Sequence, residues 1–354
     1  MKRNYIALLM LLSFFIKVQS QNFPDNQWEY DENFQENGWK IEKLQELQRF
    51  IVDSSHVTGF MIINNGKIVF EYGNTEDNSY IASCRKSILA ILYGKHVKNG
   101  KINLEATLDD LKIEDVTPLL PIEKTAKVKD LLASRSGVFL NGSNPGSWSR
   151  YYRERGSVKP GDYWIYNNWD FNLAGFIFEK LTSKDIYDEV ENQLAIPLKM
   201  EDWDKSIQRK FGNTTISKYP AYHMWFSTRD MARIGLLMLN KGKWKDKQII
   251  DENWIDNMLK FYTTNDELIK NVPTFKDAII NLGYGYMWWL WDDNNVKTKG
   301  AFSALGAMGQ SITVFPKINT VVVFKTNARF GRSNSSDITF KLLKKSVDSY
   351  IDNH

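Results

Sequence analysis

The sequence is poor in the residues that build disulfides and metal sites. Cys84 is its only cysteine, and it has only four histidines. An internal disulfide is therefore excluded, and no Cys/His cluster is present to bind zinc. Acidic and basic residues are interleaved at a net charge of +4, without a long Lys/Arg block. A nucleic-acid partner, which needs a basic stripe along the phosphate backbone, is therefore not expected.

The apolar run at the N-terminus is too short to cross a membrane. Lys2 and Arg3 precede apolar residues over 6–16, about half of the roughly 20 needed for a transmembrane helix. With the small residue Ser20 at its end, this pattern predicts a signal peptide over 1–20, and no membrane span after its removal. A lipid anchor would require cysteine where Gln21 stands. We therefore expect an exported protein, periplasmic or secreted, with residues 21–354 as its mature chain.

The mature chain has enough apolar residues for one large core, since 43% of the sequence is hydrophobic. Near its start, helical spacing predicts a helix over 41–51, and two β-rich runs on either side of Asn65-Gly66 predict a hairpin. Towards the C-terminus the pattern predicts strands over 284–290, 311–315 and 320–324, a turn over 316–319 and a helix over 336–351.

Between these two ends the pattern is helical. It predicts helices over 131–133, 172–181, 186–194 and 228–240, the last with a capping box formed by Ser227 and Asp230. The predicted fold class is α/β, more specifically α+β, with a central antiparallel sheet built from both chain ends and flanked by helices. The sheet lobe should span about 40–95 and 245–354, and an inserted helical lobe about 96–244. A cleft between the lobes is the expected ligand site.

Ser83 and Lys86 open an apolar run over 87–93. On a helix they share one face, and the helix should be buried because it is apolar nearly all round. A serine hydroxyl becomes a nucleophile when a neighbour takes its proton, and a lysine can do so when burial and the positive helix end keep it neutral. The backbone N–H of Ser83 could then stabilise an oxyanion. The alternative is an N-cap serine beside a surface lysine.

Tyr166 and Asn168 precede the predicted helix over 172–181. A phenol near Lys86 can relay a proton to a leaving group, and a carboxamide can hold a substrate carbonyl or the lysine. In the alternative interpretation Asn168 caps the helix and Tyr166 packs with neighbouring tryptophans.

A glycine-rich stretch over 302–310 runs into the predicted strand over 311–315. Gly306 and Gly309 permit a close backbone approach to substrate, and the N–H of Ala307 is our candidate for a second oxyanion donor. A strand kinked by glycine is the alternative.

Taken together, these three motifs resemble the serine β-lactamase and penicillin-binding-protein superfamily. The stretches over 131–137 (Leu-Leu-Ala-Ser-Arg-Ser-Gly) and 226–236 are similar to its β-lactamase-related serine hydrolases, and the likeness runs from about residue 40 to the end. The resemblance implies a β-lactamase/transpeptidase-like fold and an acyl-enzyme on Ser83. It implies Lys86 as general base and Tyr166 as proton shuttle, and no cofactor.

One departure from the superfamily narrows the function. Lactamases and peptidases carry a Lys-Thr-Gly or His-x-Gly triplet whose cation receives the substrate carboxylate, but counting back from Pro316 places Ala-Phe-Ser at 301–303. The stretch over 305–310 is more similar to the 6-aminohexanoate-dimer hydrolase group. The stretch Lys-Thr-Lys-Gly over 297–300 nearly matches the Lys-Thr-Gly triplet but stands a few residues too early in the chain. We interpret it as a set of polar residues at the end of a strand.

The predicted function is hydrolysis of a small-molecule ester or linear amide. Two alternatives stay open. The first is a β-lactamase or D-alanyl-D-alanine peptidase. The second is a catalytically silent protein that binds ligands on a tryptophan platform, whose candidates are Trp148, Trp164, Trp225, Trp288 and Trp289.

Overall fold

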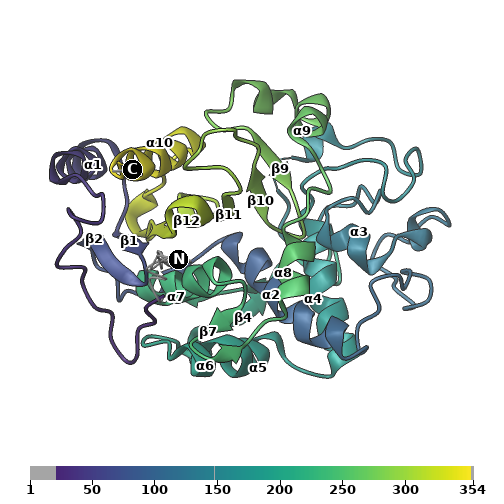
Figure 1. Ribbon diagram of the computed structural model, residues 1–354. Coiled ribbons are helices and arrows are strands. Elements are labelled where there is room, and N and C mark those ends of the chain that lie inside the picture. Colours follow the sequence, from purple (N-terminus) through teal and green to yellow (C-terminus); the bar gives the residue numbers. More distant parts are fainter. Residues whose placement is uncertain (1–20, 147, 352–354) are drawn as a thin grey trace, which may run out of the picture.

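The structure is a computed structural model that describes residues 21–146 and 148–351, so the predicted signal peptide lies outside the described residues. A seven-stranded antiparallel sheet forms its centre, in the order β2-β1-β13-β12-β11-β10-β9 (Figure 1). The strands are β1 Gly59–Asn64, β2 Lys67–Gly73, β9 Leu282–Tyr284, β10 Trp289–Trp291, β11 Phe302–Gly306, β12 Gln310–Phe315 and β13 Thr320–Lys325. Both chain ends contribute to this sheet, which confirms the predicted fold class.

Local sequence explains the two hairpins of the sheet. Asn65 and Gly66 both have positive φ, 51° and 78°, as a two-residue turn between twisted antiparallel strands requires. Between β12 and β13 the 3-10 turn η6 Pro316–Ile318 ends at Asn319, which is also left-handed. Both turns therefore form where the sequence predicts them.

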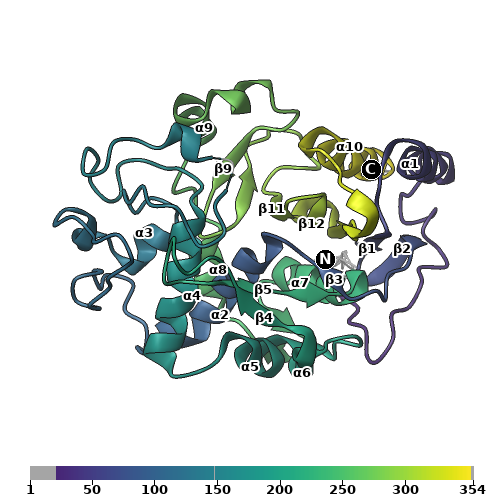
Figure 2. The same cartoon turned by 180° about the vertical axis from the view of Figure 1, so that it is seen from behind.

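Helices cover both faces of the sheet (Figures 1 and 2). On one face α1 Ile41–Ser54 packs against α10 Ser336–Asp348, which lies on β12. On the other face α7 Thr228–Leu239 packs on β1, β12 and β13, and α2 Cys84–Lys98 packs beside β11. From the sequence we expected α7 in the helical lobe, but in the structure it packs on the sheet. Gly235 permits this close approach, since a Cβ there would lie 2.3 Å from Val321 Cγ1.

The helical lobe lies to one side of the sheet. It contains α3 Val128–Leu132, α4 Asn168–Thr182, α5 Ile186–Val190, the π-helical turn η3 Glu191–Ala195, α6 Ile196–Leu198 and the 3-10 turns η1 Glu123–Thr125, η2 Ser149–Tyr151 and η4 Lys205–Ile207. Three two-stranded sheets accompany it: β3 Ser79–Tyr80 with β6 Trp225–Phe226, β4 Arg209–Phe211 with β5 Ala221–His223, and β7 Lys243–Trp244 with β8 Lys247–Gln248. The remaining elements are α8 Glu252–Met258, α9 Asn265–Asn271, η5 Pro273–Asp277 and η7 Arg329–Gly331.

The single strand predicted over 284–290 is wrong, because the chain turns there and forms the hairpin β9–β10. Gly285 donates its N–H to Trp288 O at 2.9 Å, and Met287 has a left-handed φ of 59°. A Cβ on Gly285 would lie 2.1 Å from Met258 O, so glycine is required for this approach of α8. The apolar run is thus two short paired strands.

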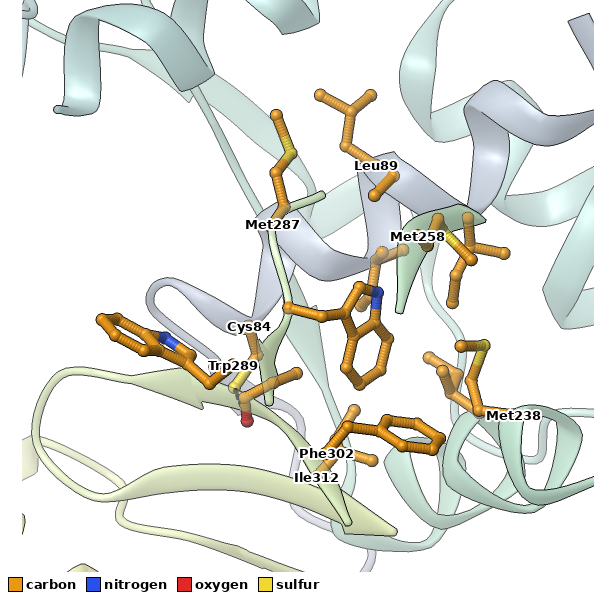
Figure 3. Packing of buried hydrophobic residues seen from close by; sticks show 14 of the residues in the cluster. Cys84, Leu89, Met238, Met258, Met287, Trp289, Phe302 and Ile312 are labelled. Carbon is orange, nitrogen blue, oxygen red and sulfur yellow. Dashed lines mark hydrogen bonds between the residues drawn. The ribbon is translucent and has the colours of Figure 1, made fainter. Parts of the chain in front are cut away.

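Helix α2 lies in the core between the sheet and α4. Figure 3 shows Leu89 of α2 near Met287 and Met258, and Cys84 at the start of the same helix beside Trp289 of β10. The free thiol of Cys84 is buried, and burial raises its pKa well above the usual thiol range. The N-terminal end of this buried helix carries Ser83 and is thereby held at one place relative to β11.

The described residues contain neither a candidate membrane span nor a candidate metal site. Over 21–146 and 148–351, no helix combines the length and the apolar character that a membrane span needs. The same residues contain no group of three or more His, Cys, Asp or Glu side chains arranged to hold a metal ion.

Candidate active site

Ser83 stands at the N-cap of α2 without capping it. Its backbone is already helical, with φ −77° and ψ −8°, and its side chain makes no capping hydrogen bond. The preceding residue, Ala82, has a φ of 48°, an uncommon left-handed conformation for a residue with a Cβ. The hydroxyl of Ser83 therefore remains free for another partner, and the alternative of a capping serine is wrong.

Lys86 is buried, with 1% of its surface exposed, so the alternative of a surface lysine is also wrong. Its Nζ lies 3.0 Å from Ser83 Oγ, 2.7 Å from Tyr166 Oη and 2.7 Å from Asn168 Oδ1. Four of the residues that the sequence singled out thus meet at one nitrogen, although Tyr166 and Asn168 come from a different lobe.

The electrostatics around this nitrogen favour neutral groups. Burial, followed by the nearby charge of Arg85, lowers the pKa of Lys86 well below the usual lysine range. Burial raises the pKa of Tyr166 above the usual range of a phenol, and a hydrogen bond with Ser83 opposes that rise. A neutral amine can accept the serine proton, and a neutral phenol can donate one.

Ser134 positions the segment that carries Tyr166. Ser134 Oγ donates to Ile165 O at 2.7 Å and accepts from Asn167 N at 3.2 Å, so it fixes the backbone on both sides of the tyrosine. Through Ser134, the stretch over 131–137 thus holds the backbone around Tyr166 in place.

The cap of α4 is Asn167, whose side chain accepts a hydrogen bond from Trp169 N at 3.0 Å. Asn168, the first residue of the helix, is therefore free to accept from Lys86. Its Nδ2 donates to Asn144 O at 2.8 Å, which orients its oxygen towards the amine. The alternative that Asn168 caps the helix is wrong.

Aromatic rings surround Tyr166. Trp289 stacks on it with ring centroids 5.6 Å apart, Phe171 lies at 4.8 Å and Trp148 at 5.9 Å. We expected Tyr166 to pack against tryptophans adjacent to it in sequence, but Trp148 and Trp289 are remote from it in the chain. These rings restrict the phenol to the side of Lys86.

The glycine-rich stretch contacts the segment before Ser83 at one point. A Cβ on Gly306 would lie 2.6 Å from Ile81 O, so the end of β11 passes close to that segment. Gly309, with a φ of 87°, instead abuts Asn334. Ala307 is exposed in the turn between β11 and β12.

Backbone groups of β11 lie next to the start of α2 and to β10. The Cys84 Sγ lies 3.4 Å from Ala304 O, so this strand runs alongside the start of α2. Ala301 O accepts a hydrogen bond from Trp291 N of β10 at 2.9 Å. Because backbone groups alternate along a strand, the N–H and C=O groups of Ser303 and Leu305 also point towards β10. Because β10 pairs with β11 only as far as Ser303, the N–H of Leu305 faces the open edge.

The triplet position over 301–303 offers no cation and is buried. Trp291 Nε1 donates to Ser303 Oγ at 2.9 Å, which holds the serine inside the sheet. In the near match, Lys297 Nζ donates to Tyr350 O at 2.5 Å, and Thr298 Oγ1 donates to Asp293 Oδ2 at 2.6 Å. Both side chains are thus engaged with residues other than those that meet at Lys86.

Sequence reasoning missed several residues of this site. Asn144 and Asn172 come from a loop and from α4, and no motif marks them. Ala82 shows its strain only through its backbone angles. Arg85 stands inside the nucleophile motif, yet the sequence does not tell whether its side chain points to solvent or to the core.

A serine hydroxyl beside a buried amine at the start of a helix, on an antiparallel sheet flanked by helices, defines a hydrolase of the β-lactamase fold. The family model described as Beta-lactamase matches residues 53–344. The chain belongs to the β-lactamase family. Over 323 residues it is 22% identical to an uncharacterized protein of Alkalihalophilus pseudofirmus, covering 81% of this chain and 87% of the relative.

Solved structures share the fold. A Bacillus anthracis protein with the provisional name 6-aminohexanoate-dimer hydrolase has a TM-score of 0.65 at 19% identity, over 93% of this chain and 89% of its own. The octameric penicillin-binding-protein homologue of Pyrococcus abyssi has a TM-score of 0.62 at 18% identity, over 87% and 78%. EstCE1, a hydrolase with promiscuous acyltransferase activity, has a TM-score of 0.61 at 14% identity, over 87% and 97%.

Proposed function

We propose that the protein hydrolyses small esters or linear amides through an acyl-enzyme on Ser83. The observation that carries this proposal is the position of the buried Lys86 amine between Ser83 Oγ and Tyr166 Oη. As a neutral base, Lys86 takes the hydroxyl proton while Oγ attacks the substrate carbonyl carbon. Tyr166 passes a proton to the leaving alcohol or amine, and water then hydrolyses the ester on Ser83 by the reverse transfers.

The oxyanion of the tetrahedral intermediate needs two donors. The N–H of Ser83, at the positive end of α2, supplies the first. For the second we favour the N–H of Leu305 over that of Ala307, because strand alternation points it to the open edge of β11 whereas Ala307 lies in the exposed turn. We propose Asn168 and Gly306 as substrate contacts, with Gly309 in a supporting role in the turn.

A penicillin-recognising enzyme is a weaker proposal. Such enzymes need a cation for the substrate carboxylate, and residues 301–303 supply none. A silent binding protein is also less well supported, because three of the five tryptophans proposed for a platform are buried in the core: Trp164, Trp288 and Trp289.

Intact-protein mass spectrometry tests the proposed function. We expect a fluorophosphonate to add one label to the chain and none to Ser83→Ala, p-nitrophenyl acetate to be turned over, and benzylpenicillin to leave no adduct. A folded protein that takes no label would refute the serine hydrolase. A stable penicillin adduct would instead assign it to penicillin recognition.

Tyr166→Phe should lower kcat for an alkyl ester such as ethyl acetate by about a hundredfold, because the alcohol leaves with a proton and the phenol that relays this proton is lost. The fold should persist, since phenylalanine keeps the ring contacts with Trp289 and Phe171. Steady-state kinetics measure the effect. Tyr284→Phe is the matched control, because it removes a neighbouring phenol that makes no contact with Lys86, and it should leave kcat near wild type. Equal rates for Tyr166→Phe and wild type would exclude the shuttle.

A further inference from the structure

Arg85 is a buried cation that has no carboxylate partner within 21–146 and 148–351. Its side chain is 1% exposed and lies over the Tyr222 ring, with Cζ 4.4 Å from the centroid. Nη2 donates to Asn172 Oδ1 at 3.3 Å, whereas Nε and Nη1 make no hydrogen bond. None of the ion pairs found among the described residues includes it. Buried arginines are normally paired, because an uncompensated buried charge costs free energy.

Three asparagine residues, all neutral, link this cation to Lys86 by hydrogen bonds. Beyond its bond with Arg85, Asn172 donates through Nδ2 to Asn144 Oδ1 at 2.8 Å. Asn144 O accepts from Asn168 Nδ2 at 2.8 Å, and Asn168 Oδ1 accepts from Lys86 Nζ at 2.7 Å. The two adjacent side chains of α2 are thus connected through amide groups, and neither of them forms an ion pair with an acid in the described part of the chain.

The titratable groups that face this pair from the surrounding elements are neutral. From α2, β3, β5, α5 and the start of α4 they are the thiol of Cys84 and the phenols of Tyr80, Tyr166, Tyr187 and Tyr222. Burial, followed by the charge of Arg85, lowers the pKa of His223 to about 4, so it is neutral at pH 7.

The acids on α4 and α5 are also accounted for. Burial raises the pKa of Asp170 well above its usual range, and this carboxyl accepts from Ser136 Oγ at 2.6 Å. Glu179 pairs with Lys210, Asp188 with Lys205 and Glu189 with His96. Among the described residues of α4 and α5, no carboxylate therefore pairs with Arg85.

We propose that Arg85 is a positioning residue whose unneutralised charge adds to the burial of Lys86 in favouring the free amine, while three linked asparagine residues hold that amine on Ser83. A guanidinium stays protonated, so when two adjacent buried cations compete it is the lysine that loses its proton. This inference rests on the proposed function. It explains why a cation is tolerated in the core directly beside the nucleophile.

The test is the pH dependence of the rate at which a fluorophosphonate labels Ser83. In wild type the rate should fall at low pH as Lys86 gains its proton. Arg85→Met removes the neighbouring charge, so this fall should move to higher pH by about one unit or more. Arg85→Lys replaces the guanidinium with an amine that burial can itself deprotonate, so its profile should shift in the same direction as that of Arg85→Met.

Asn172→Asp makes the same test without removing Arg85. It places a carboxylate where Asn172 Oδ1 already meets the guanidinium and should shift the profile in the same direction, and it also removes the Nδ2 donor to Asn144 Oδ1. Asn253→Asp, on the exposed surface of α8, makes the same change of charge and should shift nothing. Thermal unfolding verifies that each variant is folded, and Asn172→Asp still decides if Arg85→Met does not fold.

Labelling with an unshifted profile in both Arg85→Met and Asn172→Asp would overturn this inference and leave the hydrolase intact. Absence of labelling in folded wild type would instead overturn the proposed function itself.

Discussion

Replacing Lys86 with methionine lowers kcat/KM for p-nitrophenyl acetate by about a thousandfold, the range expected when a general base is lost. Methionine fills a similar volume but cannot take the proton of Ser83, so the hydroxyl stays a poor nucleophile. Steady-state kinetics and the rate of fluorophosphonate labelling measure the loss.

The same variant should be more stable than wild type. The fold lowers the pKa of Lys86 whereas the unfolded chain leaves it at its ordinary value of about 10.4, so burial of this side chain costs free energy below that pH. The unfolded state binds the additional proton, and the stability of wild type therefore rises with pH. The advantage of Lys86→Met, measured by urea unfolding, should accordingly shrink as the pH approaches that value.

Lys95→Met is the matched control for both measurements. Lys95 lies on the exposed side of the same helix, so its replacement should change neither the rate nor the pH dependence of stability. Wild-type kcat/KM in Lys86→Met would exclude Lys86 as the base.

Gly235→Ala should lower the free energy of unfolding by about 2–3 kcal/mol through overpacking. Alanine is the better helix former by about 1 kcal/mol, so an exposed glycine would show the opposite sign. Here the added Cβ would lie 2.3 Å from Val321 Cγ1 and 3.1 Å from Ile312 Cγ2, and α7 must move off the sheet. Urea unfolding measures the loss.

A double-mutant cycle isolates that contact. Val321→Ala removes the methyl groups that the new Cβ meets, so Gly235→Ala should cost about 1–2 kcal/mol less in the Val321→Ala background than alone. Strictly additive effects would mean that the helix and the sheet are not coupled at Gly235.

Local sequence was sufficient for most elements of the fold. The pair Asn65-Gly66 has the conformational freedom that its hairpin turn needs, and the apolar period of α1 is visible without its partner α10. Ser227 accepts from Asp230 N at 3.1 Å, as the predicted cap requires, although the Asp230 carboxylate instead accepts from Glu201 N and Asp202 N. The donors of that loop are remote in sequence, so the pattern could not predict them.

The strand predicted over 284–290 failed for a similar reason. Its apolar residues suit a strand, but the place where it folds back is determined by Gly285 against α8 and by the hydrogen bond from Met287 N to Leu132 O at 3.0 Å. Likewise, α7 is amphipathic in either lobe, and only the fit of Gly235 on Val321 decides which layer it joins.

The sequence by itself determined the sheet built from both chain ends, the buried helix that begins at Ser83, and the residue types able to carry acyl transfer. These follow from local periodicity and from the spacing of Ser83 and Lys86. Only the tertiary structure decided that Lys86 is buried, that Tyr166 and Asn168 reach its amine, and that Arg85 points inwards without an acid. Burial and the charges around a group depend on segments far apart in the chain, and these set the protonation state on which the proposed chemistry depends.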